Sequence, residues 1–217
     1  MKKIAFIFYL FVFQHVATAQ IHEIGVFGGG SNFIGDVGST TYINPNKWAY
    51  GFLYKWNKSP RHSWRFSYVE TTLRNNDILS NDPSRKMRGY IMQNKINELS
   101  AGLEFNFLDF DLHQPDWQFT PYIYSGLSMF FLERDDKQKS FNIPMVVGAK
   151  TRLTEHLNIG FEIGARYTFT DNIDGSKPNN PKYVQYAFGN LNSNDWYVFS
   201  GFTLTYTFGQ NPCFCNY

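Results

Sequence analysis

The chain is poor in cysteine: two among 217 residues, Cys213 and Cys215, both at its C-terminal end. With no thiol elsewhere, a disulfide framework that staples the fold is excluded. A bridge between these two would close a very small, strained ring. Two thiolates one residue apart could instead chelate a metal ion, or one could bond a partner protein. The alternative is an unstructured end with incidental thiols.

The chain also lacks an apolar run of about 18 residues, so no membrane-spanning helix is expected. A shorter apolar run from Ile4 to Phe13 follows two lysines and precedes Ala17-Thr18-Ala19. This order is typical of a secretory signal peptide, which we place at residues 1–19 with cleavage after Ala19. Position 20 is not cysteine, so a lipoprotein-type signal is not expected.

The expected mature chain also has no net charge. Cleavage would remove Lys2 and Lys3, so 20 basic residues become 18, against 18 acidic residues. A neutral chain argues against nucleic acid as a partner, because nucleic-acid binding needs a basic face. Aromatic residues make up 19% of the chain although its mean hydropathy is −0.37. Membrane β-barrels combine these two properties, because only alternate residues of each strand face lipid.

What the chain does have is alternation with a period of two, which indicates β-strands with two different faces. The segment from Trp196 to Phe208 has one aromatic and aliphatic face and one face of mostly hydroxyls and glycine. Seven earlier segments alternate similarly, and their apolar faces are marked by Ile24–Val26, Trp48–Trp56, Trp64–Tyr68, Leu99–Phe107, Phe119–Phe131, Ile143–Leu153 and Leu157–Phe169. The sequence therefore predicts an all-β fold, an eight-stranded antiparallel transmembrane barrel of the outer-membrane type, over residues 20–208.

The faces opposite the apolar ones carry charges and glycines. A soluble barrel would point its apolar face inward. The export signal and the size of the aromatic faces favour lipid outside instead, with a narrow, filled interior. Since buried charges must be paired, we expect a lumen network that plugs the barrel, rather than a catalytic or proton-conducting set. Its candidate members are Arg65, Glu98, Glu104, Lys150, Arg152, Glu162 and Arg166.

Tryptophans and loop lengths give the orientation. The five tryptophans, Trp48, Trp56, Trp64, Trp117 and Trp196, are expected in the aromatic girdles at the two membrane interfaces. Short connections, such as Asn57–Pro60 and Thr154–His156, and a moderate one, Leu108–Trp117, alternate with long polar ones, such as Gly29–Lys47, Arg74–Lys95 and Asp171–Asp195. Only Glu133–Lys139 is short among the latter. Short periplasmic turns and long external loops are the outer-membrane pattern.

The sequence has few motifs typical of catalytic, nucleotide-binding or metal-binding sites. Gly25-Val26-Phe27-Gly28-Gly29-Gly30 fits neither nucleotide-binding fingerprint, and we interpret it as glycines at a barrel rim. The histidines of the mature chain, His22, His62, His113 and His156, all fall at the periplasmic end, with no metal-ligand spacing among them. They could bind a metal or a partner, but ordinary turn residues are the simpler interpretation. No cofactor or metal is therefore expected.

Four segments have a distinctive sequence: residues 22–36 (HEIGVFGGGSNFIGD), 97–107 (NELSAGLEFNF), 121–126 (PYIYSG) and the cysteine-bearing tail. These segments resemble the PorG-like family of small outer-membrane barrels. The resemblance covers nearly the whole mature chain. It implies a place in the type IX secretion machinery of diderm bacteria, where such barrels associate with a periplasmic ring built from a lipoprotein and its partner protein. The family has no catalytic motif to carry over.

We therefore expect a structural and docking component of a protein-export complex in the outer membrane, and not an enzyme. Outer-membrane lipid and the two ring proteins are the expected partners, with no small-molecule substrate. The candidate contacts are His62, His113 and His156 with Cys213 and Cys215 in a periplasmic tail, residues 209–217. The alternatives are an outer-membrane lipid-modifying enzyme and a surface adhesin or small pore.

Overall fold

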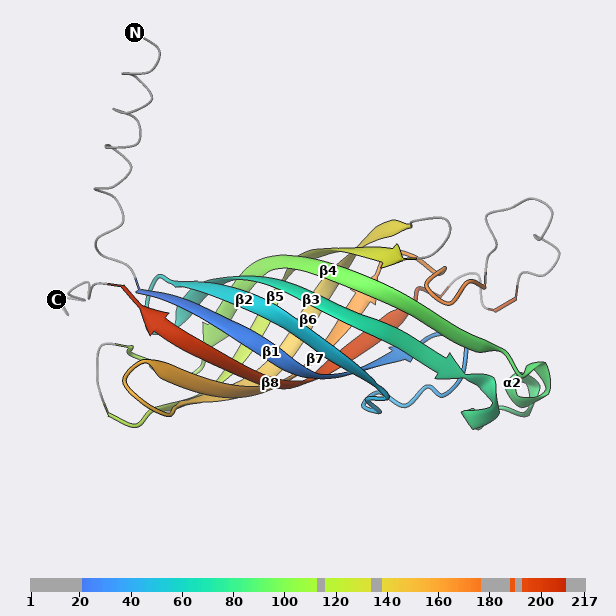
Figure 1. Ribbon diagram of the computed structural model, residues 1–217, viewed down its shortest axis with the longest axis horizontal. Helices are drawn as coiled ribbons and strands as arrows, with labels where there is room; N and C mark the ends of the chain where they lie inside the picture. The colour runs from blue at the N-terminus through green and yellow to red at the C-terminus, as the bar shows by residue number, and fades with distance from the viewer. Residues whose placement is uncertain (1–20, 113–115, 134–137, 177–187, 190–192, 210–217) are drawn as a thin grey trace, which may run out of the picture.

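The computed structural model describes residues 21–112, 116–133, 138–176, 188–189 and 193–209. Eight antiparallel strands form a closed barrel in chain order, with the last strand paired to the first (Figure 1). The strands are β1 (Ile21–Ile34), β2 (Lys47–Asn57), β3 (His62–Asn76), β4 (Ile91–Asn106), β5 (Phe119–Glu133), β6 (Lys139–Arg152), β7 (Leu157–Thr168) and β8 (Trp196–Phe208). The predicted eight-stranded antiparallel barrel is confirmed.

Burial along the strands shows which face meets lipid. In β8, Phe202, Leu204 and Tyr206 are exposed, whereas Thr203 and Thr205 between them are buried. The same alternation places rows of Tyr, Phe, Leu and Trp on the outside of the other strands. A continuous apolar and aromatic exterior is the surface of an outer-membrane barrel. Among the described residues, no helix has the length and apolarity needed to cross a bilayer.

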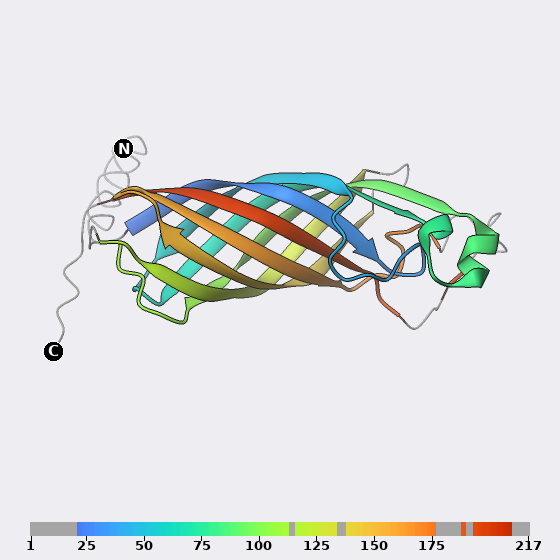
Figure 2. The same ribbon diagram turned by 90° about the horizontal axis from the view of Figure 1, so that it is seen from below.

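The strands are long and strongly tilted, as the view from below shows (Figure 2). They run from 11 residues in β2 to 16 in β4. Strands in globular proteins have about five or six residues, and a membrane-spanning strand needs about 9–11. Every strand is therefore long enough to cross the apolar band.

The glycine-rich segment of β1 does not lie at a rim, so that interpretation was wrong, as was the loop expected from Gly29. The strand continues to Ile34 and remains paired with β8, with Ser31 opposite Phe199 and Phe33 opposite Tyr197. The glycines lie in the middle of this strand, where Gly29 packs closely against the backbone of Gly201. Glycine there permits close approach of two strands rather than a bend.

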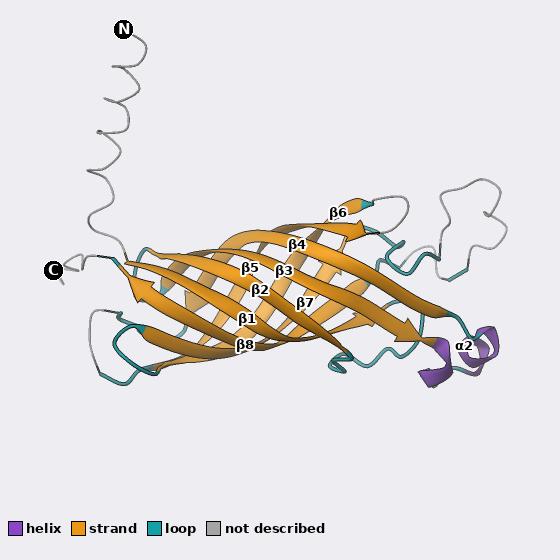
Figure 3. Ribbon diagram, in the orientation of Figure 1, coloured by secondary structure: helices purple, strands orange, loops and turns teal. Residues whose placement is uncertain are grey.

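The loop expected between Arg74 and Lys95 is also shorter than predicted, since β3 continues to Asn76 and β4 begins at Ile91. The connection holds a short 3₁₀ helix, η1 (Asp77–Leu79), and one helix, α2 (Pro83–Arg88), visible at one end of the barrel in Figure 3. At the ends of β3 and β4 next to this connection, the alternation is reversed: most outward side chains are polar and several inward ones are apolar. Leu73, Met92 and Ile96 are buried inside.

Connections at the end where β1 begins and β8 ends are mostly short, with residues 58–61 and 153–156 as the shortest. The longer connections, residues 35–46, 77–90 and 169–195, are at the opposite end, which has one short connection as well, between β5 and β6. The predicted pattern of short periplasmic turns and long external loops is therefore confirmed.

Candidate functional site

The lumen holds a network of buried ion pairs centred on Glu104 of β4. Its Oε1 accepts hydrogen bonds from the ammonium groups of Lys55 and Lys150, each at 2.7 Å, and its Oε2 lies 3.6 Å from Nη1 of Arg65. All four side chains are almost fully buried. One carboxylate therefore joins cations from three other strands.

A second pair crosses the barrel between β3 and β7. Arg65 donates two parallel hydrogen bonds to Glu162, Nη1 to Oε2 at 2.7 Å and Nη2 to Oε1 at 2.8 Å. The hydroxyl of Tyr122 donates to the same Oε2 at 2.6 Å. The fork geometry fixes both side chains in the lumen.

A third group surrounds Glu98 of β4. Arg166 donates from Nε to Oε1 at 3.4 Å, while Tyr197 and Asn142 donate to Oε2. Glycine makes room for these large side chains, since a Cβ added at Gly164 would collide with the guanidinium of Arg166. The small residues expected on the lumen face thus complement the large charged ones.

Two members of the lumen set differ from the sequence prediction. Glu23 of β1 was missed: it is fully buried and accepts hydrogen bonds from Asn57 (3.0 Å), Asn158 (3.2 Å) and Thr205 (2.6 Å). Its place on the face opposite Ile24 and Val26 was the available signal. Arg152 lies at the periplasmic rim instead, and its Nη2 donates to the backbone oxygens of Leu112 and Glu155.

Towards the external loops the lumen is filled mainly by apolar side chains, which surround the Glu98–Arg166 pair. This cluster is continuous with buried residues of the external loops, and it consists of Phe27, Phe33, Val37, Ala49, Leu53, Val69, Leu73, Met92, Ile96, Phe130, Leu132, Ile173, Tyr197 and Phe199. Ion pairs and apolar packing together fill the lumen, and the apolar share is larger towards the external loops.

The external loops close the outer end as a lid. Val37 and Ile173, from two different loops, are fully buried, and Asn75 of β3 donates to the Val37 carbonyl at 2.8 Å. Arg88 joins the first two loops by donating to Asp77 at 2.6 and 2.9 Å and to the carbonyl of Asp36 at 2.7 Å. Burial alone would raise the pKa of Asp77, but the hydrogen bonds from Arg88 and two backbone N–H groups lower it.

The lid also contains a buried acidic group. Burial, together with the neighbouring charge of Asp174, raises the pKa of Asp195 to about 8. Burial raises the pKa of Asp174 in the same way. Asp195 Oδ2 accepts a hydrogen bond from the Ile173 N–H at 2.8 Å, so its carboxyl group joins the start of β8 to the lid.

The five tryptophans lie near the two ends of the barrel. Trp48 at the start of β2 and Trp196 at the start of β8 are at the outer end, and the other three are at the periplasmic end. Trp48, Trp64 and Trp117 are exposed, whereas Trp56 and Trp196 are half-buried against Lys58 and Tyr167. This arrangement suits two interfacial girdles.

The periplasmic histidines do not form one site. His22 stacks on Tyr54 and Phe208, while His62 and His156 each pack on a different aromatic ring, Phe105 and Tyr206. In the described part of the chain no three histidine, cysteine or acidic side chains are gathered to hold a metal ion. The predicted signal peptide, His113, Cys213, Cys215 and nearly all of the predicted tail fall outside the described residues.

Comparisons with known proteins identify a family and several solved structures with a similar fold. A family model described as Domain of unknown function (DUF6089) matches residues 1–217. The N-terminal β-barrel domain of Pseudomonas aeruginosa OprF is similar at 13% identity and a TM-score of 0.47, over 88% of this chain and 99% of that one. The attachment invasion locus protein Ail of Yersinia pestis is similar at 9% identity and a TM-score of 0.45, over 88% and 100%. Neisserial surface protein A is similar at 12% identity and a TM-score of 0.45, over 87% and 96%. The search of curated proteins gave no match.

Replacing Glu104 by glutamine should strongly destabilise the barrel, because it leaves the buried ammonium groups of Lys55 and Lys150 without a carboxylate. Breaking a buried pair in this way costs about 3–5 kcal/mol. The free energy of unfolding, measured by urea titration of the barrel in lipid vesicles, should fall by this amount. The matched control Asp109→Asn breaks the exposed pair with Arg61 at 2.5 Å and should leave the midpoint nearly unchanged. Equal midpoints for Glu104→Gln and the wild type would contradict the role of the network.

Raising the pH should loosen the lid. The carboxyl of Asp195 has its pKa raised from 3.8 to about 8, so the closed lid holds a proton that an open, solvated lid releases. This contribution to lid stability is complete below about pH 4 and is lost as the pH rises towards 8. Asp195→Asn keeps an oxygen acceptor for the Ile173 N–H and removes the charge, so it should flatten the dependence.

Amide hydrogen exchange of Ile173 and Ser176, corrected for the intrinsic effect of pH on exchange, measures this opening. Asp109→Asn at the periplasmic end is the control and should retain the wild-type slope. If exchange in Asp195→Asn depends on pH as steeply as in the wild type, a group other than Asp195 is responsible for the opening.

Proposed function

The chain belongs to the family described as Domain of unknown function (DUF6089), and we propose that it is a non-enzymatic docking component of an outer-membrane protein-export machine. The observation that carries the proposal is the filled lumen. An eight-stranded barrel has an interior just wide enough for side chains. Here ion pairs and apolar packing together fill the interior, with a lid above them. Such a barrel offers surfaces for partners rather than a passage.

The resemblance of residues 22–36, 97–107 and 121–126 to PorG-like barrels supports a finer proposal. The machine is of the type IX secretion kind, and the partners are a periplasmic ring lipoprotein and its partner protein. The partner contacts would lie at the periplasmic end, which presents exposed His62 and His156 and continues into the tail with Cys213 and Cys215. No cofactor is needed for this role.

The alternative of a small pore makes a different electrical prediction. The purified barrel in planar lipid bilayers should show no steady conductance, because the lumen side chains are packed and paired. Glu104→Gln, which unbalances the lumen charge, should remain non-conducting wherever it stays folded, since the apolar cluster still blocks the barrel. Steady single-channel currents from the wild type would reject the filled-lumen proposal.

Removing the tail tests the docking proposal. A chain truncated after Gly209 retains β8 and should insert normally, but the ring lipoprotein and its partner should no longer co-purify with it from native membranes. Its folding is checked by the altered mobility of unheated barrels on gels. A full-length chain with Cys213→Ser and Cys215→Ser separates the thiols from the rest of the tail. Undiminished co-purification of the ring proteins with the truncated chain would rule out the tail as the contact.

A lipid-modifying enzyme is the remaining alternative. It requires a polar catalytic cluster at the outer rim, and the histidines of the described residues all lie at the other end. Phospholipid hydrolysis by the purified barrel would favour that function over docking.

A further inference from the structure

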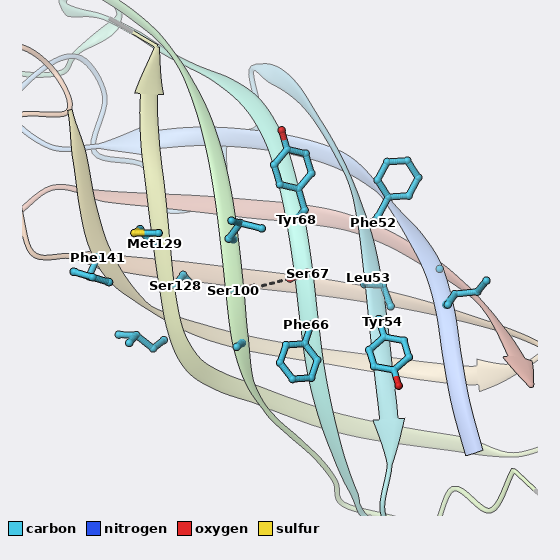
Figure 4. Close-up of a pocket in the computed structure, with 15 residues that line it drawn as sticks. Phe52, Leu53, Tyr54, Phe66, Ser67, Tyr68, Ser100, Ser128, Met129 and Phe141 are labelled. Carbon is cyan, nitrogen blue, oxygen red and sulfur yellow. Dashed lines mark hydrogen bonds between the residues drawn. The ribbon is translucent and has the colours of Figure 1, made fainter. Parts of the chain in front are cut away.

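One polar side chain interrupts the outward row of β1 near the external end of the barrel. Figure 4 shows the usual outer wall on β2 and β3, from which Phe52 and Phe66 project outward. Asn32 belongs to the outward row of β1, yet it is only 2% exposed. Its partner in the register, Val198 of β8, is an outward residue that is also 2% exposed. The outer wall is therefore covered by another part of the chain at this level.

The cover is the second part of the connection from β1 to β2, residues 39–46, which we call the strap. The side-chain amide of Asn32 donates to the carbonyl of Thr41 at 3.2 Å and to that of Tyr42 at 3.1 Å. The side-chain oxygen of Asn32 accepts a hydrogen bond from the Asn44 N–H at 3.3 Å. Because Asn32 points away from the lumen, these contacts place the strap on the outside of the barrel.

The far end of the strap is fixed to the wall as well. The N–H of Asn46 donates to the Ser31 carbonyl at 3.0 Å, and its side chain donates to the Arg74 carbonyl at 2.9 Å. Pro45 packs on the outward side of Gly30, where an added Cβ would lie 2.5 Å from the proline. Glycine thus lets the strap lie close to the wall. Backbone groups of the strap are paired with the barrel, as a segment with little access to water requires.

The strap lies at the level of the outer aromatic girdle. In the register of the sheet, Gly30 of β1 lies opposite Trp48. Ile34 lies opposite Trp196. Asn32 is halfway between these two positions, and two residues along a strand cover only about 7 Å. Since tryptophans mark the interface between membrane and water, the strap is held at this interface rather than in the water above it.

The composition of the strap suits an interface. Residues 39–46 (STTYINPN) contain no charged side chain, whereas the external connections 77–90 and 169–195 contain five each. Tyr42 and Ile43 are 76% and 53% exposed. Tyrosine is enriched at membrane interfaces, and an apolar side chain there is covered by lipid. A surface without charge, at the girdle, is matched to lipid rather than to a partner recognised by ion pairs.

We propose that the strap is an interfacial anchor that lies in the outer leaflet of the membrane, with Ile43 at the acyl boundary and the Tyr42 ring among the headgroups. Such an anchor fixes the depth of the barrel on the side where β1 and β8 close the sheet. It is independent of the docking role, because it lies at the external end of the barrel and not at the periplasmic end.

Spin labels measure where the strap lies. A single cysteine, Tyr42→Cys or Ile43→Cys, is introduced into a full-length chain that carries Cys213→Ser and Cys215→Ser. The labelled barrels are reconstituted in vesicles of phosphatidylethanolamine and phosphatidylglycerol. Collisions of the label with oxygen, which concentrates in lipid, are then compared with collisions with a water-soluble nickel chelate.

Two reference positions calibrate the measurement. Leu204→Cys places the label on the lipid-facing row of β8, and Met87→Cys places it on α2, where the side chain is 90% exposed beyond the girdle. The ratio of oxygen to nickel collisions for Ile43→Cys should approach the ratio for Leu204→Cys, with Tyr42→Cys between the two references. A label at residue 43 that meets nickel as often as the label at residue 87 would place the strap in water and overturn the proposal. A label shielded from both reagents would overturn it too, by assigning the strap to a protein contact such as a second copy of the chain.

Replacing Asn32 tests how the strap is held. Asn32→Leu removes the hydrogen bonds to the strap and should raise nickel collisions at residue 43. Asn97→Leu is the matched control, because Asn97 is an outward asparagine of β4 that bonds to Glu133 and Tyr68 instead. It should leave the ratio at residue 43 unchanged, and the gel mobility of each unheated variant verifies folding. Equal ratios at residue 43 with and without Asn32→Leu would overturn the proposed attachment.

Discussion

Closure of the sheet by β1 and β8 is the constraint on which the rest of the structure depends. In a bilayer, unpaired backbone N–H and C=O groups at a sheet edge are too costly, so a spanning sheet must close. The two strands are paired from His22 opposite Phe208 to Ile34 opposite Trp196, over the full length of β8. With the strand number at eight, the interior has room for side chains only. What fills that interior is then a packing problem, which this chain solves in two ways.

Ion pairs fill most of the periplasmic half, and apolar side chains around one further pair, Glu98 with Arg166, fill the outer half. Charged side chains lose their hydration inside the barrel, so each must find a partner there. Glu104 joins Lys55 and Lys150, while Arg65 and Glu162 form a bidentate pair. The apolar side chains of the outer half need no such matching, and they pack against Val37 and Ile173 of the lid. Loop order and barrel packing are therefore coupled at the outer end.

Sequence patterns predicted the strands whose outward face is apolar along its whole length, and they predicted most of the lumen charges. They failed where the pattern depends on what surrounds the strand. The ends of β3 and β4 carry polar residues outside and Leu73, Met92 and Ile96 inside, so a search for apolar outer faces ends too early. Pairing partners were also out of reach, since Arg65 and Glu162 are 97 residues apart.

The polar outward residues at the ends of β3 and β4 also show where this protein can carry a specific binding surface. Inside the barrel every large side chain is engaged in filling space, and changing one requires changing its partners. The outer wall has no such requirement, since lipid tolerates most apolar shapes. A small residue at Ala101 and a paired set of charges on β3, β4 and β5 are therefore departures that packing does not demand. Charged groups on the lipid side of a barrel cost less near the interface than at the bilayer centre, at about 0–1 kcal/mol against 2–4 kcal/mol. The place of Glu70, Lys95 and Glu133 beyond the apolar part of their strands keeps that cost low, and it leaves a surface on which recognition can be built without disturbing the fold.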